Sequence, residues 1–537
     1  MRVLNGYEPA SVLGFFEDIC NIPHISYHEK ELSDYCVAFA KERGLYYEQD
    51  ELGNVIIIGE ATPGYEDVEP IIIQGHLDMV GDKVPECDID MEKESIRIMV
   101  DGDYITADGT TLGGDDGIAV AYGLALLDAK DIPHPRLECV FTICEETGLE
   151  GATAIDLSCC KAKRLLNIDS EDEGVFTAGC AGGMRADCKI PVEMISKSGV
   201  VCEIKTTGFL GGHSGVEIHK GRANANVMMG RFFLYIKDKV ACDLVSMAGG
   251  VKDNVIPKNA NATFIVAEAD VDALKKAVVE FNAMIKAEYG VTDSNIAIVL
   301  EVKDVAECAV LTEESKEKAI TALNLMPNGV QAMSQDLPSL VETSLNMGVM
   351  KIDAEGIQTC FSIRSSVATA KEYLAAKLEQ ITKSLGGETS YHGEYPGWEY
   401  ARESKLRDLC IKVYEKQTGV TPKVEVIHAG LECGLLADKI EGLDCISLGP
   451  NMRDVHTPDE VISISSIARV WEFLKAVLAE NKFKIVTIFG SLGYNQTVKF
   501  FMQIHKGDNN EELLNARKKI LVLLFARAVL YDIRSVG

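Results

Sequence analysis

The chain has 537 residues, more than a single hydrophobic core of about 250 to 300 residues organises, so at least two domains are expected. Its composition, with 47% hydrophobic and 25% charged residues, is that of a soluble globular protein and excludes a disordered chain. The 82 acidic residues outnumber the 53 Lys and Arg residues, giving a net charge of -29, which argues against nucleic acid or an anionic membrane as the main partner.

The cysteines and the apolar runs favour the cytoplasm. Sixteen cysteines are scattered along the chain, with an adjacent pair at Cys159 and Cys160 and no C-x-x-C spacing, which is typical of a reducing compartment. The first apolar run is followed directly by two acids, so no secretory signal is expected. The run Ile520 to Leu530 is interrupted by Arg527 and is shorter than the roughly 20 residues of a membrane helix.

From residue 53 onward, short apolar runs alternate with helical patterns. Buried strands separated by helices predict an α/β fold with a mainly parallel sheet and flanking helices. In such sheets, functional groups lie just beyond the carboxyl ends of the strands. The expected strands are 54–58, 70–74, 137–143 and 164–168, and the expected helix is 117–129.

The pattern changes near residues 183 to 190, and the following segment contains its own strands and a helical stretch from Lys371 to Ser384. We interpret this segment as an inserted α+β lid domain, followed by a linker rich in Gly, Pro and aromatic residues. A helix near 401–417 then resumes the first domain. The expected limits are 1–184 and 392–480 for the first domain, 185–391 for the insertion, and 481–537 for a C-terminal extension with no assigned role.

The first chemical signal is the motif Gly75-His76-Leu77-Asp78 after the apolar run that ends at Gln74. A histidine at the end of a buried strand is available as a metal ligand, and an acid two residues later can hold its ring. Taken alone, the motif is explained equally well by a core histidine whose hydrogen bonds are satisfied.

Two acidic pairs follow. Asp115 and Asp116 come after two glycines and before an apolar helix, where capping explains one acid better than two. Glu145 and Glu146 follow the strand at 137–143. Adjacent carboxylates beside a core are costly unless a cation is present or one is protonated, although a solvated turn is the alternative.

Asp169 follows the apolar run at 164–168, and His456 lies in the segment DVHTPDE. Either one alone could be a surface loop residue. Because successive elements bring these acids and histidines to the same edge of one sheet, the sequence predicts a metal site. Imidazole and carboxylate ligands suit zinc, and cobalt and manganese share these preferences. One carboxylate bridging two ions would explain how few side chains fill two sites.

These five motifs, in this order, resemble the M20 family of metallopeptidases, in particular its cytosolic non-specific and Xaa-His dipeptidases. The resemblance covers about residues 5 to 480. It implies two zinc sites: His76 and Asp169 bind one ion, Glu146 and His456 bind the other, and Asp115 bridges both.

The resemblance also implies roles for the neighbouring acids. Asp78 would orient His76, and Glu145 would be the general base. A strained peptide bond is expected between Asp115 and Asp116.

The inserted domain carries further candidates. The Gly-flanked His213 could reach a developing oxyanion. Asn254 and Arg364 resemble lid residues that bind the substrate carbonyl and its terminal carboxylate, and the planar guanidinium of arginine suits the second role. A surface salt bridge is the alternative for Arg364. The segment HAGLECG resembles a substrate-binding loop, with His428 and Gly430 as its candidate contacts.

The sequence therefore predicts a two-zinc enzyme that hydrolyses dipeptides, including Xaa-His dipeptides, with Glu145 activating a metal-bridged water. The alternatives are a tripeptidase, an N-acyl amino acid deacylase, or a metal-stabilised binding protein without catalysis. The presence of both Glu145 and His213 speaks against the last. The expected partners are small peptides rather than nucleic acid or membrane, and the oligomeric state stays open, with a homodimer among the alternatives.

Overall fold

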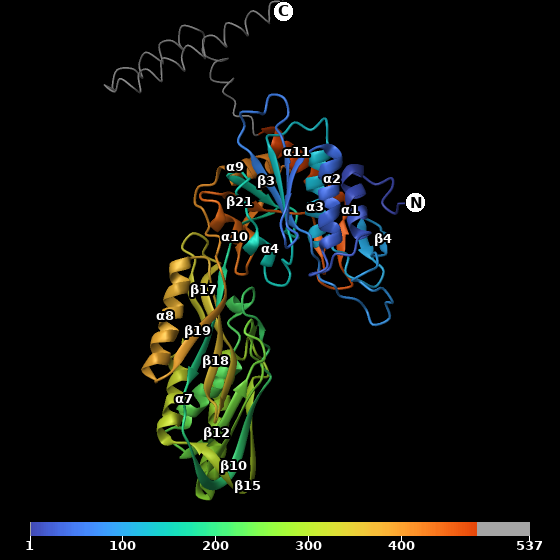
Figure 1. The fold of residues 1–537 in the computed structure, drawn as a ribbon. Helices are drawn as coiled ribbons and strands as arrows, with labels where there is room; N and C mark the ends of the chain where they lie inside the picture. Colours follow the sequence, from blue (N-terminus) through green and yellow to red (C-terminus); the bar gives the residue numbers. More distant parts are fainter. Residues whose placement is uncertain (1, 481–537) are drawn as a thin grey trace, which may run out of the picture. The chain divides into compact units, whose positions relative to one another are not determined.

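The computed structural model of the chain describes residues 2–480. The extension 481–537, with its apolar run at 520–530, lies outside these residues. Within the described part, the strands form two large sheets, a four-stranded sheet and a two-stranded sheet (Figure 1). The helices of this part are all too short or too polar to cross a membrane.

The first large sheet has a parallel centre. Strands β6, β3, β7 and β21 run parallel, β20 pairs parallel with β8, and β1 and β2 form an antiparallel edge. The predicted mainly parallel sheet is thus confirmed, with antiparallel additions. Its order is β1 (Tyr46–Gln49), β2 (Val55–Gly59), β6 (Leu137–Thr142), β3 (Ile71–His76), β7 (Arg164–Asn167), β21 (Asp444–Ser447), β8 (Val175–Cys180) and β20 (Lys423–Ile427).

Helices cover both faces of this sheet, which is why β2, β3 and β6 are buried along their whole length. One face packs against α1 (Ala10–Cys20), α2 (Lys30–Arg43), α3 (Gly114–Asp128), α9 (Lys405–Thr418) and α11 (Ile464–Glu480). The other face packs against α10 (Glu432–Lys439) and the segment that follows α4 (Glu150–Ala154). The expected helices near 117–129 and 401–417 correspond to α3 and α9.

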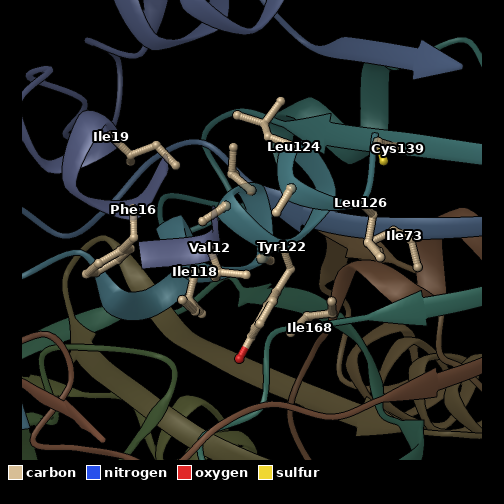
Figure 2. Packing of buried hydrophobic residues seen from close by; sticks show 14 of the residues in the cluster. Val12, Phe16, Ile19, Ile73, Ile118, Tyr122, Leu124, Leu126, Cys139 and Ile168 are labelled. Atoms are coloured by element: carbon tan, nitrogen blue, oxygen red, sulfur yellow. The ribbon is translucent and has the colours of Figure 1, made fainter. Parts of the chain in front are cut away.

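Helix α3 is buried on nearly all sides, as its apolar sequence predicts. Figure 2 shows Phe16 and Ile19 of α1 packed beside Ile118 and Tyr122 of α3. The Tyr122 hydroxyl donates a hydrogen bond to the carbonyl oxygen of Ile467, at 2.8 Å. Truncating Phe16 to alanine in such a core would cost about 3–5 kcal/mol. The core therefore fixes α3, and with it the loop at its N-terminus.

The second large sheet has the order β15 (Ala297–Leu311), β10 (Met194–Thr207), β14 (Ala260–Val266), β12 (Cys242–Gly249), β17 (Val341–Asp353), β18 (Gly356–Ser365), β9 (Gly182–Ile190) and β19 (Glu388–Tyr395), with β16 (Gly329–Met333) paired to β17. Helices α5 (Ala225–Ile236), α6 (Val271–Tyr289), α7 (Glu313–Leu325) and α8 (Ala368–Ser384) contribute to one apolar cluster with it. This confirms the predicted α+β lid. Its limits at 185 and 391 remain a prediction.

The lid sheet consists of two halves with the same βαββαβ order. In the first half, β10, α5, β12, β14, α6 and β15 follow one another along the chain; in the second, β9, α7, β17, β18, α8 and β19 do so. The first half is inserted between β9 and α7 of the second. The halves join where β12 pairs with β17 over three residue pairs.

Two small sheets complete the described part. One has the order β22 (Met452–Arg453), β23 (Val461–Ser463), β5 (Tyr104–Ala107) and β4 (Ile98–Asp101). The other pairs β11 (Gly212–His213) with β13 (Val255–Ile256). The first carries the loop that contains His456, and the second contains His213.

Candidate metal centre

His76 is the last residue of β3, and its side chain is buried. Its Nε2 atom lies 3.1 Å from Asp115 Oδ1 and 3.9 Å from Asp169 Oδ1. On the other side of the ring, Nδ1 lies 2.9 Å from the carbonyl oxygen of Asp78 and 3.4 Å from its carboxylate. Asp78 therefore holds the ring so that Nε2 faces the two acids.

The carboxylate of Asp78 also holds the turn after β6. It accepts hydrogen bonds from the backbone N–H groups of Glu145, at 2.9 Å, and Glu146, at 3.2 Å. The Ser26 hydroxyl donates a third, at 2.8 Å. Burial opposes ionisation of Asp78, but the contact with His76 and these hydrogen bonds outweigh it and lower the pKa of Asp78. One buried acid thus fixes both the imidazole and the glutamate pair.

Asp115 lies between two imidazoles. Its Oδ1 atom faces His76, and its Oδ2 atom lies 3.1 Å from His456 Nε2. Although burial opposes ionisation, the hydrogen bonds from His456 and His76 lower the pKa of Asp115. The peptide bond between Asp115 and Asp116, where a strained bond was predicted, is cis. A carboxylate with one oxygen toward each of two histidines has the arrangement of a bridging ligand.

His456 and the two glutamates form the other side of the group. His456 lies on the loop between β22 and β23, and its Nε2 atom is 2.8 Å from Glu146 Oε1. Hydrogen bonds with Asp115 and Glu146 raise the pKa of His456 to about 10. Burial raises the pKa of Glu145 to about 8, and the charge of Glu432 adds to this effect.

These donors fit a divalent metal. Within residues 2–480, Asp115, Glu146 and Asp169 form ion pairs with histidines and none with lysine or arginine. Burial raises the pKa of Asp169 well above its usual value, and the negative charges of Asp115 and Asp116 raise it further. Cations would relieve this repulsion. Three groups have all their donor atoms within 4.8 Å of one another: His76 with Asp116 and Asp169, His76 with Glu145 and Glu146, and Asp115 with Glu146 and His456.

Asp116 is not among the ligands predicted from the sequence. It is fully buried, its Oδ2 atom accepts a hydrogen bond from the backbone N–H of His76 at 3.2 Å, and its Oδ1 atom has no hydrogen-bond partner. The tandem of acids at 115 and 116 was the available signal. Asp116 is therefore a further donor beside His76 and Asp169.

Two other buried glutamates were also missed. Glu432, at the start of α10, accepts hydrogen bonds from the Thr142 hydroxyl at 2.7 Å and from the Gln74 side chain. Glu460 accepts hydrogen bonds from backbone N–H groups at residues 112–115. Both lie inside the motifs HAGLECG and DVHTPDE, in which other residues were the predicted candidates.

In the lid, His213 and Asn254 are neighbours. His213 on β11 pairs with Val255 on β13, and the backbone N–H of Ser214 donates to the carbonyl oxygen of Asn254 at 2.9 Å. The Asn346 side chain donates to the carbonyl oxygens on both sides of Asn254, at Asp253 and Val255. The β11–β13 pairing therefore brings together two candidates that are 41 positions apart in the sequence.

Arg364 and His428 complete the set of four candidates His213, Asn254, Arg364 and His428, which we call the lid group. Arg364 on β18 is 8% exposed and donates to the Tyr395 hydroxyl at 3.1 Å. The Nε2 atom of His428 is 2.7 Å from the hydroxyl oxygen of Ser344. Ser344 on β17 is paired with Arg364 on β18. Burial lowers the pKa of His428 to about 3, with Arg364 adding to the effect. His428 is therefore neutral at physiological pH.

The segment 428–432 runs between the lid group and the strand end that precedes Glu145 and Glu146. Its first residue contacts Ser344 of the lid, and its last contacts Thr142 at the end of β6. Between them, Gly430 lies against the Tyr395 ring, since a Cβ atom at this position would be 2.8 Å from Tyr395 Cε2. Only glycine allows this approach without displacing the ring.

Comparisons with known proteins agree with this geometry. The chain is 37% identical over 483 residues to the cytosol non-specific dipeptidase of Escherichia coli (strain K12), covering 89% of this chain and 99% of that protein. The chain belongs to the M20 family of metallopeptidases. The family that the five motifs predict is thereby confirmed.

Solved structures and a family model support the membership. The crystal structure of an aminoacylhistidine dipeptidase from Vibrio alginolyticus is 35% identical, with a TM-score of 0.84, and the match covers 89% of this chain and 98% of that one. Aminopeptidase PepT from Bacillus cereus, 17% identical with a TM-score of 0.51 over 88% and 99% of the two chains, shares the fold. The M20 model described as a peptidase dimerisation domain matches residues 204–293, which lie within the first half of the lid.

Proposed function

We propose that this protein is a two-zinc dipeptidase. The observation that carries the proposal is the Asp115 carboxylate, which has an imidazole at each oxygen and the adjacent Glu145 and Glu146 beside it. The names of the E. coli and Vibrio relatives support dipeptides, including Xaa-His dipeptides, as the substrate class.

In this proposal His76 and Asp169 would hold one zinc ion, Glu146 and His456 would hold the other, and Asp115 would be the ligand shared by both. Imidazole and carboxylate donors suit zinc, and they also accept cobalt or manganese. When bound, the ions would supply a lowered pKa for a shared water and polarisation of the scissile carbonyl. Asp78 acts indirectly, by orienting His76 and the glutamate turn.

Glu145 moves the protons. It takes one from the attacking water as the oxygen–carbon bond forms, and it gives that proton to the leaving amine as the amide carbon–nitrogen bond breaks. Its position suits this role, because the backbone N–H of Glu145 is held by Asp78 while its carboxylate is among the candidate donors of the metal centre.

The lid group recognises the substrate. Arg364 would bind the terminal carboxylate, and its Nε atom is buried without a hydrogen-bond partner. Unpaired buried donors are costly, so an incoming carboxylate would satisfy them. His213 and Asn254 would stabilise the developing oxyanion. His428 and Gly430 shape the loop that lies between these residues and the metal centre.

A substrate panel on metal-analysed protein tests the proposal. We expect two zinc ions per chain and faster hydrolysis of Ala-His and other dipeptides than of a tripeptide or an N-acetyl amino acid. Cleavage of the acetylated substrate alone would establish a deacylase instead, and cleavage of the tripeptide alone a tripeptidase. Zinc binding without hydrolysis of any of them would point to a binding protein.

The dimerisation-domain match supports a homodimer, although the β12 edge of that half is paired with β17 of the same chain. Light scattering on the purified protein gives the mass and decides between monomer and dimer. The name of the E. coli relative supports a cytoplasmic location, which cell fractionation tests.

A further inference from the structure

Glu460 is a buried carboxylate that receives four consecutive backbone N–H groups. The residue is 2% exposed. Oε2 accepts from Leu112 at 2.7 Å and Gly113 at 3.1 Å, and Oε1 accepts from Gly114 at 2.8 Å and Asp115 at 3.4 Å. Leu112 and Gly113 precede α3, and the backbone at Asp115 and Asp116 is not helical, so these four N–H groups lie on the irregular segment before the regular part of the helix, where buried donors need an acceptor.

The sequence makes this approach feasible at two glycines. Gly113 has a φ of +73°, a backbone conformation that residues with a side chain rarely adopt. A Cβ atom at Gly114 would lie 3.1 Å from Glu460 Oε1. Gly114 therefore leaves room for the Glu460 carboxylate, and Gly113 allows the backbone to turn beside it.

Glu460 also belongs to the loop that carries His456. Its backbone N–H donates to the carbonyl oxygen of Thr457 at 3.1 Å, and its own carbonyl accepts from the Thr106 hydroxyl at 2.9 Å. The next residue starts β23, which pairs with β5 and β22. One side chain thus fastens the His456 loop to the Asp115 loop, although these segments are about 345 residues apart.

We propose that Glu460 is a positioning residue of the metal centre, which fixes the Asp115 loop relative to the His456 loop. The inference rests on the proposed metal ligands. His456 is 45% exposed, so packing alone restrains it weakly, and its distance to Asp115 depends on how the two loops are joined. Groups outside the ligand shell that orient ligands typically change metal affinity by about 10-fold to 100-fold when they are replaced.

The competing explanation is that Glu460 only caps α3 and contributes to stability. Glu138 offers a matched control, because it is also a buried carboxylate that accepts backbone N–H groups, from Lys161 at 2.9 Å and Ala162 at 3.0 Å. It lies near the start of β6, whereas Glu145 and Glu146 follow the end of this strand. Loss of either carboxylate removes hydrogen bonds from backbone N–H groups; Glu138 also accepts from Arg136 at 2.8 Å, so Glu138→Gln tests the loss of a buried carboxylate at least as severely.

The test compares Glu460→Gln and Glu138→Gln in the full-length protein. Glutamine has the same size but offers a single acceptor oxygen, and its NH2 group would face N–H donors. Zinc dissociation constants are measured by competition with a chromogenic chelator, and thermal unfolding of the metal-free proteins measures stability. We expect about 10-fold to 100-fold weaker binding of at least one zinc ion in Glu460→Gln, and less than about a 2-fold change in Glu138→Gln.

Unchanged zinc affinity in Glu460→Gln, or an equal loss in Glu138→Gln, would overturn the inference and leave the proposed function intact. A wild-type protein that binds no zinc would overturn the proposed function and the inference with it. If Glu460→Gln does not fold, Glu460→Asp replaces it, because aspartate keeps both acceptor oxygens on a side chain one methylene shorter. In that variant, wild-type zinc affinity would contradict the inference, and weaker binding would support it.

Discussion

The metal-ligand group, which comprises His76, Asp115, Glu146, Asp169 and His456, differs from the lid group in the charge of its side chains. The first collects acids that lack lysine or arginine partners within the described part of the chain. Hydrogen bonds from two histidines lower the pKa of Asp115, whereas burial and the neighbouring acids raise the pKa of Asp169. The second gathers Arg364, whose Nε has no hydrogen-bond partner, and a neutral His428. The first group is therefore suited to cations and the second to an anion. A dipeptide carries its scissile carbonyl and its terminal carboxylate a short, fixed distance apart, and two groups of this kind could bind both.

The largest effect is expected from removing the shared carboxylate of the metal group. Asp115→Ala should lower the zinc content from two ions per chain to less than one and reduce turnover to background, because both candidate sites lose a ligand. Metal analysis after gel filtration and a dipeptide assay measure these quantities. Asp156→Ala, on an exposed loop, is the control and should retain both ions. Full zinc content in Asp115→Ala would contradict the bridging role.

The next effect separates chemistry from metal binding. Glu145→Gln should keep two zinc ions and lower kcat by about 10²-fold to 10⁴-fold, the usual contribution of a general base. The Asp78 hydrogen bond to the Glu145 backbone is unaffected by the change, so the turn should keep its position. Stopped assays over long times give kcat, and metal analysis gives occupancy. A near-normal kcat would assign the proton transfer to another group.

The metal group should also show a pH dependence that the lid group lacks. Hydrogen bonds with the neighbouring acids hold the pKa of His456 at about 10 and that of His76 well above its usual value, so both imidazoles are protonated in the metal-free protein at pH 7. Each must lose its proton before it can bind zinc. We expect at least two protons to be released per chain, and the product of the two zinc association constants to rise at least about 100-fold per pH unit near neutrality.

Calorimetric zinc titrations in buffers of different ionisation enthalpy count these protons. A count of zero would mean that the imidazoles are neutral before zinc binds. His428 needs no such change because its lowered pKa keeps it neutral, so a His428→Gln variant should release the same number of protons.

The two groups also differ in how far the sequence predicts them. His76 ends β3, and Glu146 and Asp169 follow β6 and β7, the neighbouring strands of the parallel centre. The carboxyl ends of parallel strands meet at one edge of a sheet, so the sequence pattern is enough to predict that these three residues lie together. The structure adds Glu460, whose four acceptor contacts could not be read from spacing because they join segments about 345 residues apart.

The lid is less accessible to sequence reasoning. The apolar patterns predict an α+β domain, but not that one half is inserted into the other, because strand order depends on pairing rather than on local periodicity. The contact between His428 and Ser344 requires the register that places Ser344 opposite Arg364. The partner of Arg364, Tyr395, lies on the linker side of the expected limit at 391, in a segment whose one sequence signal is a turn-rich composition.

The smallest expected effect tests whether the lid group is positioned as firmly as the metal group. Tyr395→Phe removes the hydroxyl that accepts from Arg364 at 3.1 Å but keeps the ring against Gly430. A hydrogen bond to a charged group contributes about 1.5–3 kcal/mol when fully buried. Tyr395 is partly exposed and the substrate carboxylate would share the guanidinium, so we expect KM to rise about 3-fold to 10-fold with kcat and zinc content unchanged. In an Arg364→Ala background the same change should have no further effect, because residues in contact are not additive. Equal, additive increases in KM in both backgrounds would show that Tyr395 acts on the substrate independently of Arg364.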